Sequence, residues 1–285
     1  MPATSRTERR AARSLGYAYP DHLRTAADAL PRLPGVYTFH GQEGLLPLYI
    51  GKSIDIRTRV LSHFRQADEA ALLRQSADVQ CVVTAGDLGA QLLEAAMVKA
   101  ERPLYNRLLR KVPRQFSLRL YRGKVDVVHS AELDLATAPM TFGLYSSERA
   151  AKSAIRRVAD ENRLCYSLVG LERLPPGRPC FRSMLRQCAG ACCGGETPAE
   201  HAERLAAALS MLEIADWSYG GPVAIEEVGD HMHQFHVVDA WRYYGSASTL
   251  AEARRIPRHA AAFDRDAYRI LRAAFAATEW PVFAL

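Results

Sequence analysis

The hydrophobic pattern of residues 35–106 switches several times between the period of a strand and the period of a helix. The order of these switches constrains the fold more than any other feature. Residues 35–40 alternate as a strand does, and residues 48–50 form the expected partner strand across a hairpin loop. Ser53 is expected to cap a helix whose apolar stripe runs from residue 56 to residue 64. A strand at 79–84 and a helix at 88–100, capped by Asp87, follow. The order β-β-α-β-α predicts a small α/β domain of roughly 100 residues.

The rest of the chain predicts further strands and helices around a cysteine-rich segment. The expected strands are 116–121, 124–129, 141–145, 223–228 and 235–244, and the expected helices are 21–30, 147–160, 198–214 and 264–277. The fold class is therefore α/β (α+β), with four regions. These are an N-terminal arm with a short helix (1–30), the small α/β domain (31–112), a region of strands, a helix and cysteines (113–197), and a C-terminal α+β region (198–285).

Composition excludes some classes of protein. Hydrophobic residues make up 48% of the 285 residues and charged residues 24%, which is ordinary for a globular protein. No stretch approaches the ~20 consecutive apolar residues of a membrane span. Residues 1–13 are polar and arginine-rich and lack the apolar core of a signal peptide. We therefore expect a cytoplasmic protein with a flexible N-terminal arm and no membrane partner.

Positive charge is concentrated in the first part of the chain. Residues 1–120 hold 18 Lys and Arg against 11 Asp and Glu, whereas the remaining residues hold 19 against 20. Residues 102–122 contain seven basic side chains and no acidic one. Such a run favours contact with a polyanion, of which nucleic acid is the commonest, although a solvated basic face remains the alternative.

Several polar side chains of residues 35–106 have the chemistry that phosphodiester cleavage requires, namely a base, a cation and a metal ligand. Tyr37 and Tyr49 lie on the two strands of the expected hairpin, and Lys52 follows at the strand-to-helix turn. Arg59 and His63 are four residues apart, so they share one face of the next helix. The pattern predicts a site for phosphodiester chemistry between this hairpin and this helix.

Glu94 is the most informative acidic residue. Its neighbours within residues 92–97 are apolar, and a carboxylate in such a setting is costly unless it is paired or binds a cation. Mg²⁺ or Mn²⁺ would suit one carboxylate together with waters and a substrate phosphate. A plain structural reading stays open for every candidate: half-buried strand tyrosines, a solvated helix face for Arg59 and His63, an exposed Glu94, and Asn106 as a turn former.

Taken together, the order and spacing of these residues resemble the GIY-YIG endonuclease family. The matching elements are residues 35–37, residues 48–53, Arg57, Arg59, Glu94 and Asn106. Within that family the chain is most similar to the N-terminal nuclease of UvrC, and above all to the short UvrC homologues known as Cho endonucleases. The similarity to the Cho endonucleases continues through residues 177–182 and 188–195, nearly to the C-terminus.

The resemblance implies how the proton chemistry is divided. Glu94 would hold one divalent metal, Mg²⁺ or Mn²⁺. Tyr49, or a water that it orients, would act as the general base, with Tyr37 supporting the nucleophile. His63 stands where the UvrC pattern has a tyrosine late in the helix, and histidine also relays protons, so the identity of the base stays open.

The resemblance also implies supporting roles. Arg59 would stabilise the charge that develops on the phosphate, Lys52 would help to lower the tyrosine pKa, and Asn106 would brace the site. Further basic residues are candidates for contacts to DNA. These are Arg57, Arg107, Arg110, Lys111 and Arg114.

Five of the six cysteines fall within 29 residues. Cys165, Cys180, Cys188 and Cys192 have 14, 7 and 3 residues between them, and Cys193 is adjacent. Without a secretory signal, a metal site is favoured over structural disulfides, and buried free thiols remain the alternative. The corresponding cysteines of UvrC-like proteins are associated with a [4Fe–4S] cluster, so the resemblance favours that cluster over zinc, with Cys193 as a spare ligand.

The resemblance implies a repair endonuclease that makes one metal-dependent incision in double-stranded DNA, on the 3′ side of a bulky lesion, after UvrA and UvrB have located it. A second nuclease domain and tandem helix-hairpin-helix elements, as in a full UvrC, are not expected in 285 residues. Residues 198–230 contain no recognisable UvrB-binding hairpin, so the contact with UvrB stays open. Two alternatives remain: a sequence-specific GIY-YIG nuclease of restriction or homing type, and a non-catalytic DNA-binding or redox-sensing module built around the cysteines.

Overall fold

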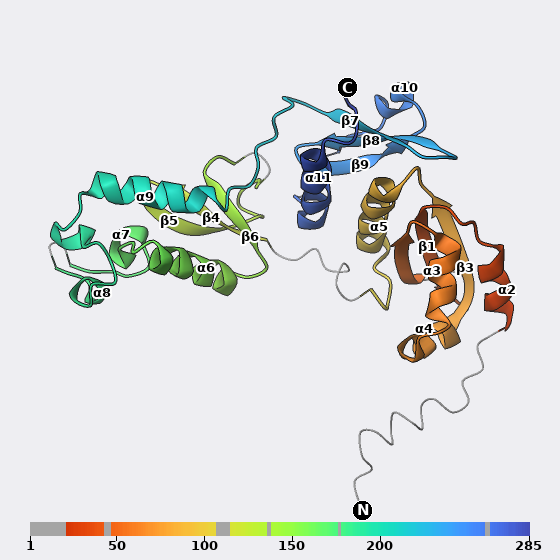
Figure 1. Ribbon diagram of the computed structural model, residues 1–285, viewed down its shortest axis with the longest axis horizontal. Coiled ribbons are helices and arrows are strands. Elements are labelled where there is room, and N and C mark those ends of the chain that lie inside the picture. The colour runs from red at the N-terminus through yellow and green to blue at the C-terminus, as the bar shows by residue number, and fades with distance from the viewer. Residues whose placement is uncertain (1–20, 43–46, 107–114, 136–137, 176–177, 260–262) are drawn as a thin grey trace, which may run out of the picture. The chain divides into compact units, whose positions relative to one another are not determined.

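A computed structural model describes the chain except for residues 1–20, 43–46, 107–114, 136–137, 176–177 and 260–262 (Figure 1). Its contacts divide the chain into two compact units. The first unit contains Met1–Val112, Gly221–His259 and Asp266–Leu285, and the second contains Pro113–Gly220 and Ala260–Arg265. The small α/β domain and the C-terminal sheet therefore belong to one unit, although more than 100 residues of sequence separate them.

The small α/β domain is built on a three-stranded antiparallel sheet in the order β2-β1-β3. Its strands are β1 (Gly35–Gly41), β2 (Pro47–Ser53) and β3 (Ser76–Val83). Its helical elements are α2 (Asp21–Ala29), α3 (Ile56–His63), η1 (Ala67–Glu69), α4 (Ala70–Gln75) and α5 (Asp87–Glu101). The expected order β-β-α-β-α is confirmed, with α4 as an additional short helix before β3.

The central strand β1 is buried on both of its faces. Tyr37 and Phe39 pack into a core with Ile56 and other apolar residues of α2, α3 and α4. Val36 points the other way and packs with Val98 of α5. Because side chains alternate along a strand, two helical layers can cover the two faces of this one sheet. This arrangement brings strand residues close to both α3 and α5, where the candidate site residues lie.

Helix α3 begins later than the sequence suggests. Asp55 is its N-cap, and its carboxylate accepts hydrogen bonds from the Thr58 backbone N–H (2.8 Å) and hydroxyl (2.7 Å). Ser53 pairs with Gly35 as the last residue of β2, and its hydroxyl donates to the Asp55 carbonyl. The prediction that Ser53 caps this helix is therefore wrong, because the strand continues through Ser53.

The start of α5 also differs from the expectation. Asp87 is the first helical residue, whereas Gly86 occupies the N-cap position and offers no side chain to cap the helix. The Asp87 carboxylate accepts a hydrogen bond from Lys52 Nζ at 2.6 Å instead. Asp87 is therefore not the cap of α5, and the first N–H groups of this helix are bound by another part of the chain.

The C-terminal part of the first unit is a four-stranded antiparallel sheet in the order β10-β7-β8-β9. Its elements are β7 (Val223–Val228), β8 (His233–Asp239), β9 (Arg242–Ala247), α10 (Leu250–Ala253), α11 (Arg265–Ala277) and β10 (Val282–Ala284). The single strand expected at 235–244 is two strands. Ala240 and Trp241 both have positive φ angles (46° and 62°), which is typical of a tight two-residue hairpin turn.

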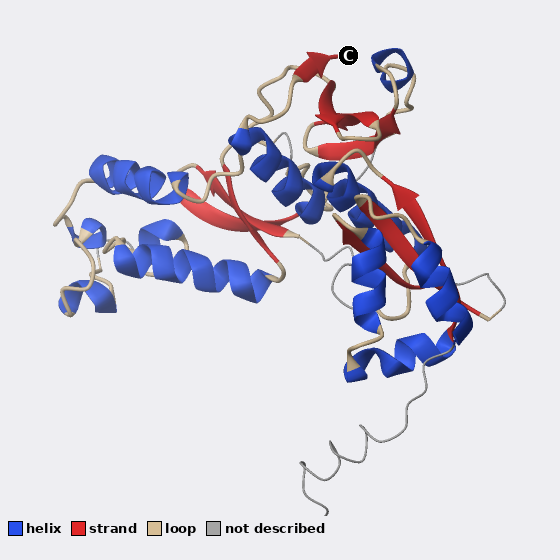
Figure 2. Ribbon diagram, turned by 45° about the vertical axis from the view of Figure 1, so that its right-hand side comes forward, coloured by secondary structure: helices blue, strands red, loops and turns tan. Residues whose placement is uncertain are grey.

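The second unit is a three-stranded sheet in the order β5-β4-β6 with helices packed against it (Figure 2). Its elements are β4 (Phe116–Tyr121), β5 (Lys124–His129), β6 (Thr141–Tyr145), α6 (Glu148–Glu161), α7 (Tyr166–Val169), α8 (Phe181–Met184), η2 (Ala191–Cys193) and α9 (Pro198–Ser210). The three expected strands are confirmed. Leu118, Ile155 and Leu205 share one core, so β4, α6 and α9 bury their apolar faces together. None of the helices in the described part of the chain has the length and hydrophobicity to cross a membrane.

Candidate active site

Tyr37 and His63 join β1 to α3 through a buried hydrogen bond. The Tyr37 hydroxyl lies 2.8 Å from His63 Nε2, and both residues are 0% exposed. The Tyr49 ring, on β2, lies beside both of them, with centroid distances of 6.1 Å to Tyr37 and 5.5 Å to His63. The structure thus brings the three candidates for proton transfer into one cluster.

Gly51 makes this close approach possible. It pairs with Tyr37 across the β1–β2 ladder. A Cβ atom at Gly51 would stand 2.5 Å from the Tyr37 hydroxyl oxygen and 2.8 Å from Tyr49 Cε1, which is closer than atoms pack. The two phenol rings therefore pack against Gly51, and any larger residue at this position would force the rings to move.

Arg59 supplies positive charge to the cluster from α3. Its guanidinium lies close enough to both phenol groups to act on their pKa. Burial raises the pKa of Tyr37 and of Tyr49, and the charge of Arg59 acts in the opposite direction on both. Because the pKa of each phenol remains above its ordinary value, both stay protonated at neutral pH in the chain as described.

His63 is neutral at the same pH. Burial, and then the charge of Arg59, lower the pKa of His63 to about 4. Its Nδ1 atom lies 3.7 Å from a carboxylate oxygen of Glu69. That oxygen is too far away for a hydrogen bond, but its charge favours the tautomer with the proton on Nδ1, in which Nε2 accepts from the Tyr37 hydroxyl.

Glu94 projects from α5 towards the end of β2. Its carboxylate lies near the Lys52 backbone N–H. Burial raises the pKa of Glu94, and the Lys52 N–H, the Lys52 ammonium and Arg59 act against that rise. Within the described part of the chain, no cation lies at ion-pair distance from this carboxylate. A half-buried carboxylate without a cation at ion-pair distance is suited to bind a hard divalent cation, which can be held by one protein carboxylate.

Lys52 has a different partner from the one expected. Its ammonium binds Asp87 at 2.6 Å, and the cation that acts to lower the pKa of Tyr49 is Arg59. The action of Lys52 on a tyrosine therefore stays a prediction without a direct contact to support it. No local pattern indicated the ion pair with Asp87, because Asp87 had a plausible place as a helix cap.

Asn106 braces the strand that carries Tyr49. Its Oδ1 atom accepts from the Ile50 backbone N–H at 2.9 Å, and its Nδ2 donates to the Ile50 carbonyl at 2.7 Å. The amide thus replaces a neighbouring strand at Ile50, between Tyr49 and Gly51. This contact agrees with the bracing role that the resemblance implies for Asn106.

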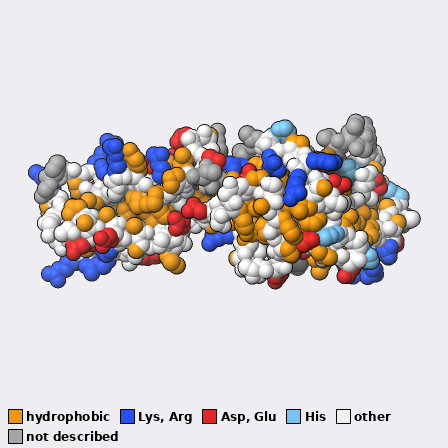
Figure 3. Space-filling model, turned by 90° about the horizontal axis from the view of Figure 1, so that it is seen from above, with side chains coloured by type: hydrophobic (Ala, Val, Ile, Leu, Met, Phe, Trp, Pro, Cys, Tyr) orange, Lys and Arg blue, Asp and Glu red, His pale blue; other side chains and the backbone are white. Residues whose placement is uncertain are grey.

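The candidates for DNA contact are less well placed. Arg57 Nε donates to the Leu30 carbonyl at 2.6 Å, so part of this side chain holds the end of the α2 segment. On the face drawn in Figure 3, the described Lys and Arg side chains stand in separate groups. The remaining candidates lie outside the described residues, and their contact with DNA stays a prediction. They are Arg107, Arg110, Lys111 and Arg114.

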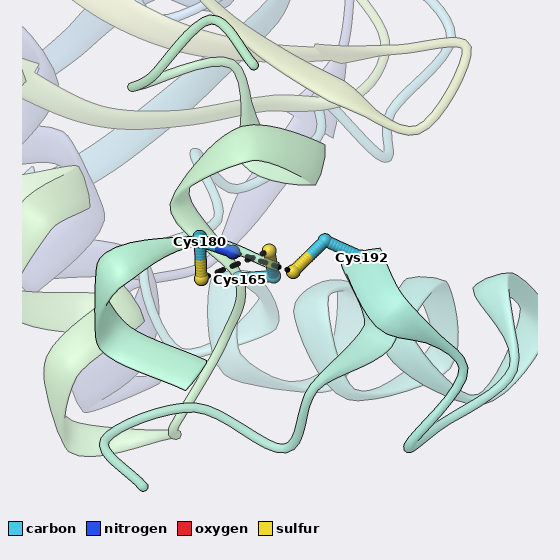
Figure 4. A group of neighbouring side chains, drawn as sticks. All are labelled: Cys165, Cys180 and Cys192. Atoms are coloured by element: carbon cyan, nitrogen blue, oxygen red, sulfur yellow. Dashed lines mark hydrogen bonds between the residues drawn. The ribbon is translucent and has the colours of Figure 1, made fainter. Parts of the chain in front are cut away.

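The cysteines meet in the second unit. Figure 4 shows the side chains of Cys165, Cys180 and Cys192 pointing towards one another from the starts of α7 and α8 and from η2. Their sulfur atoms all lie within 4.8 Å of one another. Cys188 joins them, with its Sγ 3.5 Å from that of Cys180. Cys193 is exposed and its Sγ lies 3.2 Å from the Ser183 hydroxyl.

The environment of these four thiols fits a thiolate-bound metal group. Cys165 and Cys180 each have a pKa raised to about 11, chiefly by burial. Burial acts on Cys192 in the same sense, but hydrogen bonds from the Cys180 backbone N–H and neighbouring thiols lower its pKa. Three mutually close thiols, with Cys188 beside Cys180, offer soft ligands here, and a bound cation would favour their ionised forms. The donor set suits an iron–sulfur cluster or zinc.

Comparison with known families covers nearly the whole described chain. Residues 33–107 match the model of the UvrC-like GIY-YIG domain, residues 115–211 that of the UvrC/Cho excinuclease middle domain, and residues 222–284 that of the excinuclease Cho C-terminal domain. Excinuclease Cho of Escherichia coli K12 is 49% identical over 255 residues, which are 90% of this chain and 86% of that protein. The chain belongs to the Cho excinuclease family. The resemblance drawn from the motifs is confirmed, and the chain is an endonuclease of the GIY-YIG type.

Further similar proteins include another Cho protein and UvrC proteins. Excinuclease Cho of Salmonella typhi is 47% identical over 90% of this chain and 87% of that protein. UvrABC system protein C of Geobacter metallireducens is 31% identical over 67% of this chain, but the match covers only 32% of that protein. The solved GIY-YIG N-terminal endonuclease domain of UvrC from Thermotoga maritima, bound to its catalytic divalent cation magnesium, is 27% identical. The match covers 30% of this chain and 98% of the solved UvrC domain, with a TM-score of 0.29.

Proposed function

We propose that this Cho-family protein is a metal-dependent DNA endonuclease of excision repair that makes one incision on the 3′ side of a bulky lesion. The observation that carries the proposal is the setting of Glu94. This half-buried carboxylate lies near the Lys52 N–H and within electrostatic range of Arg59 and the Tyr49 phenol. A metal ligand, a cation for the phosphate and a proton acceptor therefore converge on one place.

Glu94 would hold Mg²⁺ or Mn²⁺. When bound, such a cation polarises a phosphate oxygen and adds positive charge beside the phenols. Arg59 lies at the exposed edge of the cluster, where its guanidinium reaches a DNA phosphate and stabilises the charge that develops on it. The Lys52–Asp87 ion pair ties the end of β2 to the first residue of α5, the helix that carries Glu94.

Tyr49 would orient the attacking water, and it would accept the proton of that water as the phenolate, a form that the positive charge of Arg59 and of a bound cation favours. Tyr37 lies behind Tyr49, and its hydroxyl forms a hydrogen bond with His63 Nε2. Because His63 is neutral, it keeps a free acceptor for this hydrogen bond and holds the Tyr37 oxygen in one orientation towards Tyr49. His63 thus replaces the tyrosine of the UvrC pattern as a buried acceptor rather than as an exposed base.

The DNA contacts of the basic run at 102–122 would be to phosphates. Phosphate contacts give affinity that falls with salt, but they carry no base-sequence information. Another component must then choose the site of incision, and a complex of UvrA and UvrB that has marked a lesion fits that role. This assignment places the protein in the cytoplasm, with damaged double-stranded DNA and UvrB as partners.

We also propose that Cys165, Cys180, Cys188 and Cys192 hold a [4Fe–4S] cluster, with Zn²⁺ as the alternative. Backbone N–H groups already point at the sulfur atoms: Ser183 donates to Cys180 Sγ and Cys180 to Cys192 Sγ, both at 3.3 Å. Such hydrogen bonds support ionised thiolate ligands and tune the bound group.

The experiment for this proposal uses matched duplexes, with and without one bulky lesion, and adds or withholds UvrA and UvrB. The expected result is one incision 3′ to the lesion that requires the loader. Neutralising Arg107, Arg110 and Lys111 together should weaken binding equally on all sequences and flatten the salt dependence. Cleavage of undamaged DNA at one fixed sequence without partners would instead identify a restriction-type or homing-type nuclease.

A further inference from the structure

Helix α5, which carries Glu94, receives its N-terminal cap from the C-terminal sheet. The backbone N–H groups of Leu88 and Gly89 donate to the two carboxylate oxygens of Glu227, each at 2.9 Å. Glu227 lies on β7, 139 residues beyond Leu88 in the sequence. A helix N-terminus carries partial positive charge and unpaired N–H groups, so a carboxylate binds there favourably.

A buried hydrogen-bonded chain fixes Glu227 in this position. His236 Nε2 lies 2.9 Å from Glu227 Oε2, and His236 Nδ1 lies 2.7 Å from the Ser246 hydroxyl. The Ser246 hydroxyl lies in turn 2.7 Å from that of Tyr243. Burial acts to raise the pKa of Glu227, but hydrogen bonds from His236, Gly89 and Leu88 lower it below its ordinary value, so the carboxylate is ionised.

Three glycines allow the small α/β domain and the C-terminal sheet to come into close contact at the start of α5. A Cβ at Gly86 would stand 2.4 Å from Glu227 Oε1, and one at Gly89 would stand 2.8 Å from His236 Cε1. Gly229 follows β7 in the C-terminal sheet, and a Cβ there would stand 1.9 Å from the Ala85 carbonyl oxygen. The backbones of the two parts therefore approach more closely than side chains at these positions would permit.

The other end of α5 is bound to the same part of the chain. Lys99 Nζ lies 3.1 Å from an Asp266 carboxylate oxygen on α11, and both side chains are largely buried. Glu94 lies between these two attachments. The C-terminal sheet and α11 therefore hold α5 near both of its ends, while Glu94 faces the Lys52 N–H.

We propose that Glu227 is a positioning residue of the nuclease: through the cap that it supplies to α5, the C-terminal sheet sets the place of the Glu94 carboxylate. This inference rests on the proposed function, in which Glu94 holds the divalent metal. Loss of the cap lets the first turn of α5 fray, which moves Asp87 and its partner Lys52 as well as Glu94. The Cho C-terminal domain then contributes to catalysis, because it positions the Glu94 carboxylate.

The test uses the full chain with the substitution Glu227→Gln, in which one carboxylate oxygen becomes an amide donor that faces the helix N–H groups. We expect the Mn²⁺ concentration for half-maximal incision to rise about 10-fold, as for other residues that orient a metal ligand, with the rate largely restored at saturating Mn²⁺. Amide hydrogen exchange at Leu88 and Gly89 should become faster. The matched control is Glu226→Gln on the same strand, which breaks an exposed pair with His233 (2.7 Å) and should change neither quantity.

A second variant keeps the inference testable if Glu227→Gln does not fold. Gly89→Ala favours the helix locally, but its Cβ would stand 3.0 Å from Glu227 Oε2 and displace the cap. We expect the same shift in Mn²⁺ dependence. A lower rate at an unchanged half-saturating Mn²⁺ concentration, or unchanged amide exchange in both variants, overturns the inference. Wild-type protein without metal-dependent incision would instead contradict the proposed function, while the exchange measurement still tests the cap.

Discussion

The Tyr37 hydroxyl lies 2.8 Å from the buried Nε2 atom of His63, and this pair sets the proton chemistry of the site. The pKa of His63 is lowered to about 4, so the imidazole is neutral wherever the enzyme is expected to work. A neutral acceptor behind Tyr37 keeps that phenol oriented without adding charge to a cluster that already contains Arg59. The stability of the fold and the rate of cleavage should therefore respond differently to changes at His63 and at the tyrosines.

Protonation of His63 should destabilise the fold. The folded pKa is about 4 against an ordinary value of 6.5, so the unfolded chain takes up the proton first as the pH falls. The contribution of His63 to stability is complete above about pH 6.5 and is lost as the pH falls towards 4, by at most about 3 kcal/mol. Urea unfolding at pH 7.5 and pH 4.5 measures this loss. It should be smaller in His63→Phe than in wild type, and an equal loss in both proteins would contradict the account.

Removal of the Tyr49 hydroxyl should affect cleavage far more than folding. Tyr49→Phe keeps the ring contacts but removes the group that accepts the proton, so we expect a loss of about 10²–10⁴-fold in the incision rate. Tyr105→Phe is the control, because its hydroxyl binds Gln75 at 2.7 Å in the same domain. Single-turnover rates at saturating metal measure the effect. A Tyr49→Phe rate close to that of Tyr105→Phe would remove Tyr49 from the mechanism.

The sequence predicted the parts of the site that local patterns and a known motif determine. The strand pair that carries Tyr37 and Tyr49, and the helix that carries Glu94, lie close to where alternation and helical spacing put them. The bracing of Ile50 by Asn106 also agrees with the expectation from the motif. These features depend on residues that are near in sequence or belong to one recognisable set.

Contacts between distant segments were not predictable in the same way. The cap on α5 comes from Glu227, and no local signal connects residue 88 with residue 227. Asp87 was a reasonable cap by position, but the nearby Lys52 ammonium binds it instead. The late start of α3 has a similar cause, since pairing with Gly35 keeps Ser53 in the strand. In each case a tertiary contact overrode a local preference.

Loss of the Asn106 amide should weaken the strand that carries Tyr49. Asn106→Ala leaves the buried N–H and carbonyl of Ile50 without their partners, which costs about 1–3 kcal/mol of unfolding free energy. The incision rate should fall as well, because Ile50 lies between Tyr49 and Gly51. Asn162→Ala in the second unit, which removes one bond to the Val158 carbonyl, is the control. Full activity of Asn106→Ala would show that the brace is dispensable.

The four clustered cysteines should carry the metal group, and the other two should not be needed for it. Protein purified without oxygen should be brown and contain about four irons per chain. Cys188→Ser should bleach it and lower the stability of the second unit, because metal-binding energy is partly folding energy. Cys193→Ser and Cys81→Ser are the controls, since neither sulfur belongs to the four. Colourless protein with stoichiometric zinc would show that the cysteines bind zinc instead of an iron–sulfur cluster. Protein with neither metal would show that they are buried free thiols.

The most direct test of the account is incision of a lesion-bearing duplex, loaded with UvrA and UvrB, by wild-type chain and by Glu94→Gln across a titration of Mg²⁺. Glu101→Gln, at the exposed end of the same helix, is the matched control. We predict that wild type and Glu101→Gln incise once and only with metal, whereas Glu94→Gln loses at least about 100-fold at every metal concentration while it remains folded. Incision by Glu94→Gln at the wild-type rate, or by wild type in the presence of chelator, would contradict the central claim that Glu94 holds the catalytic metal.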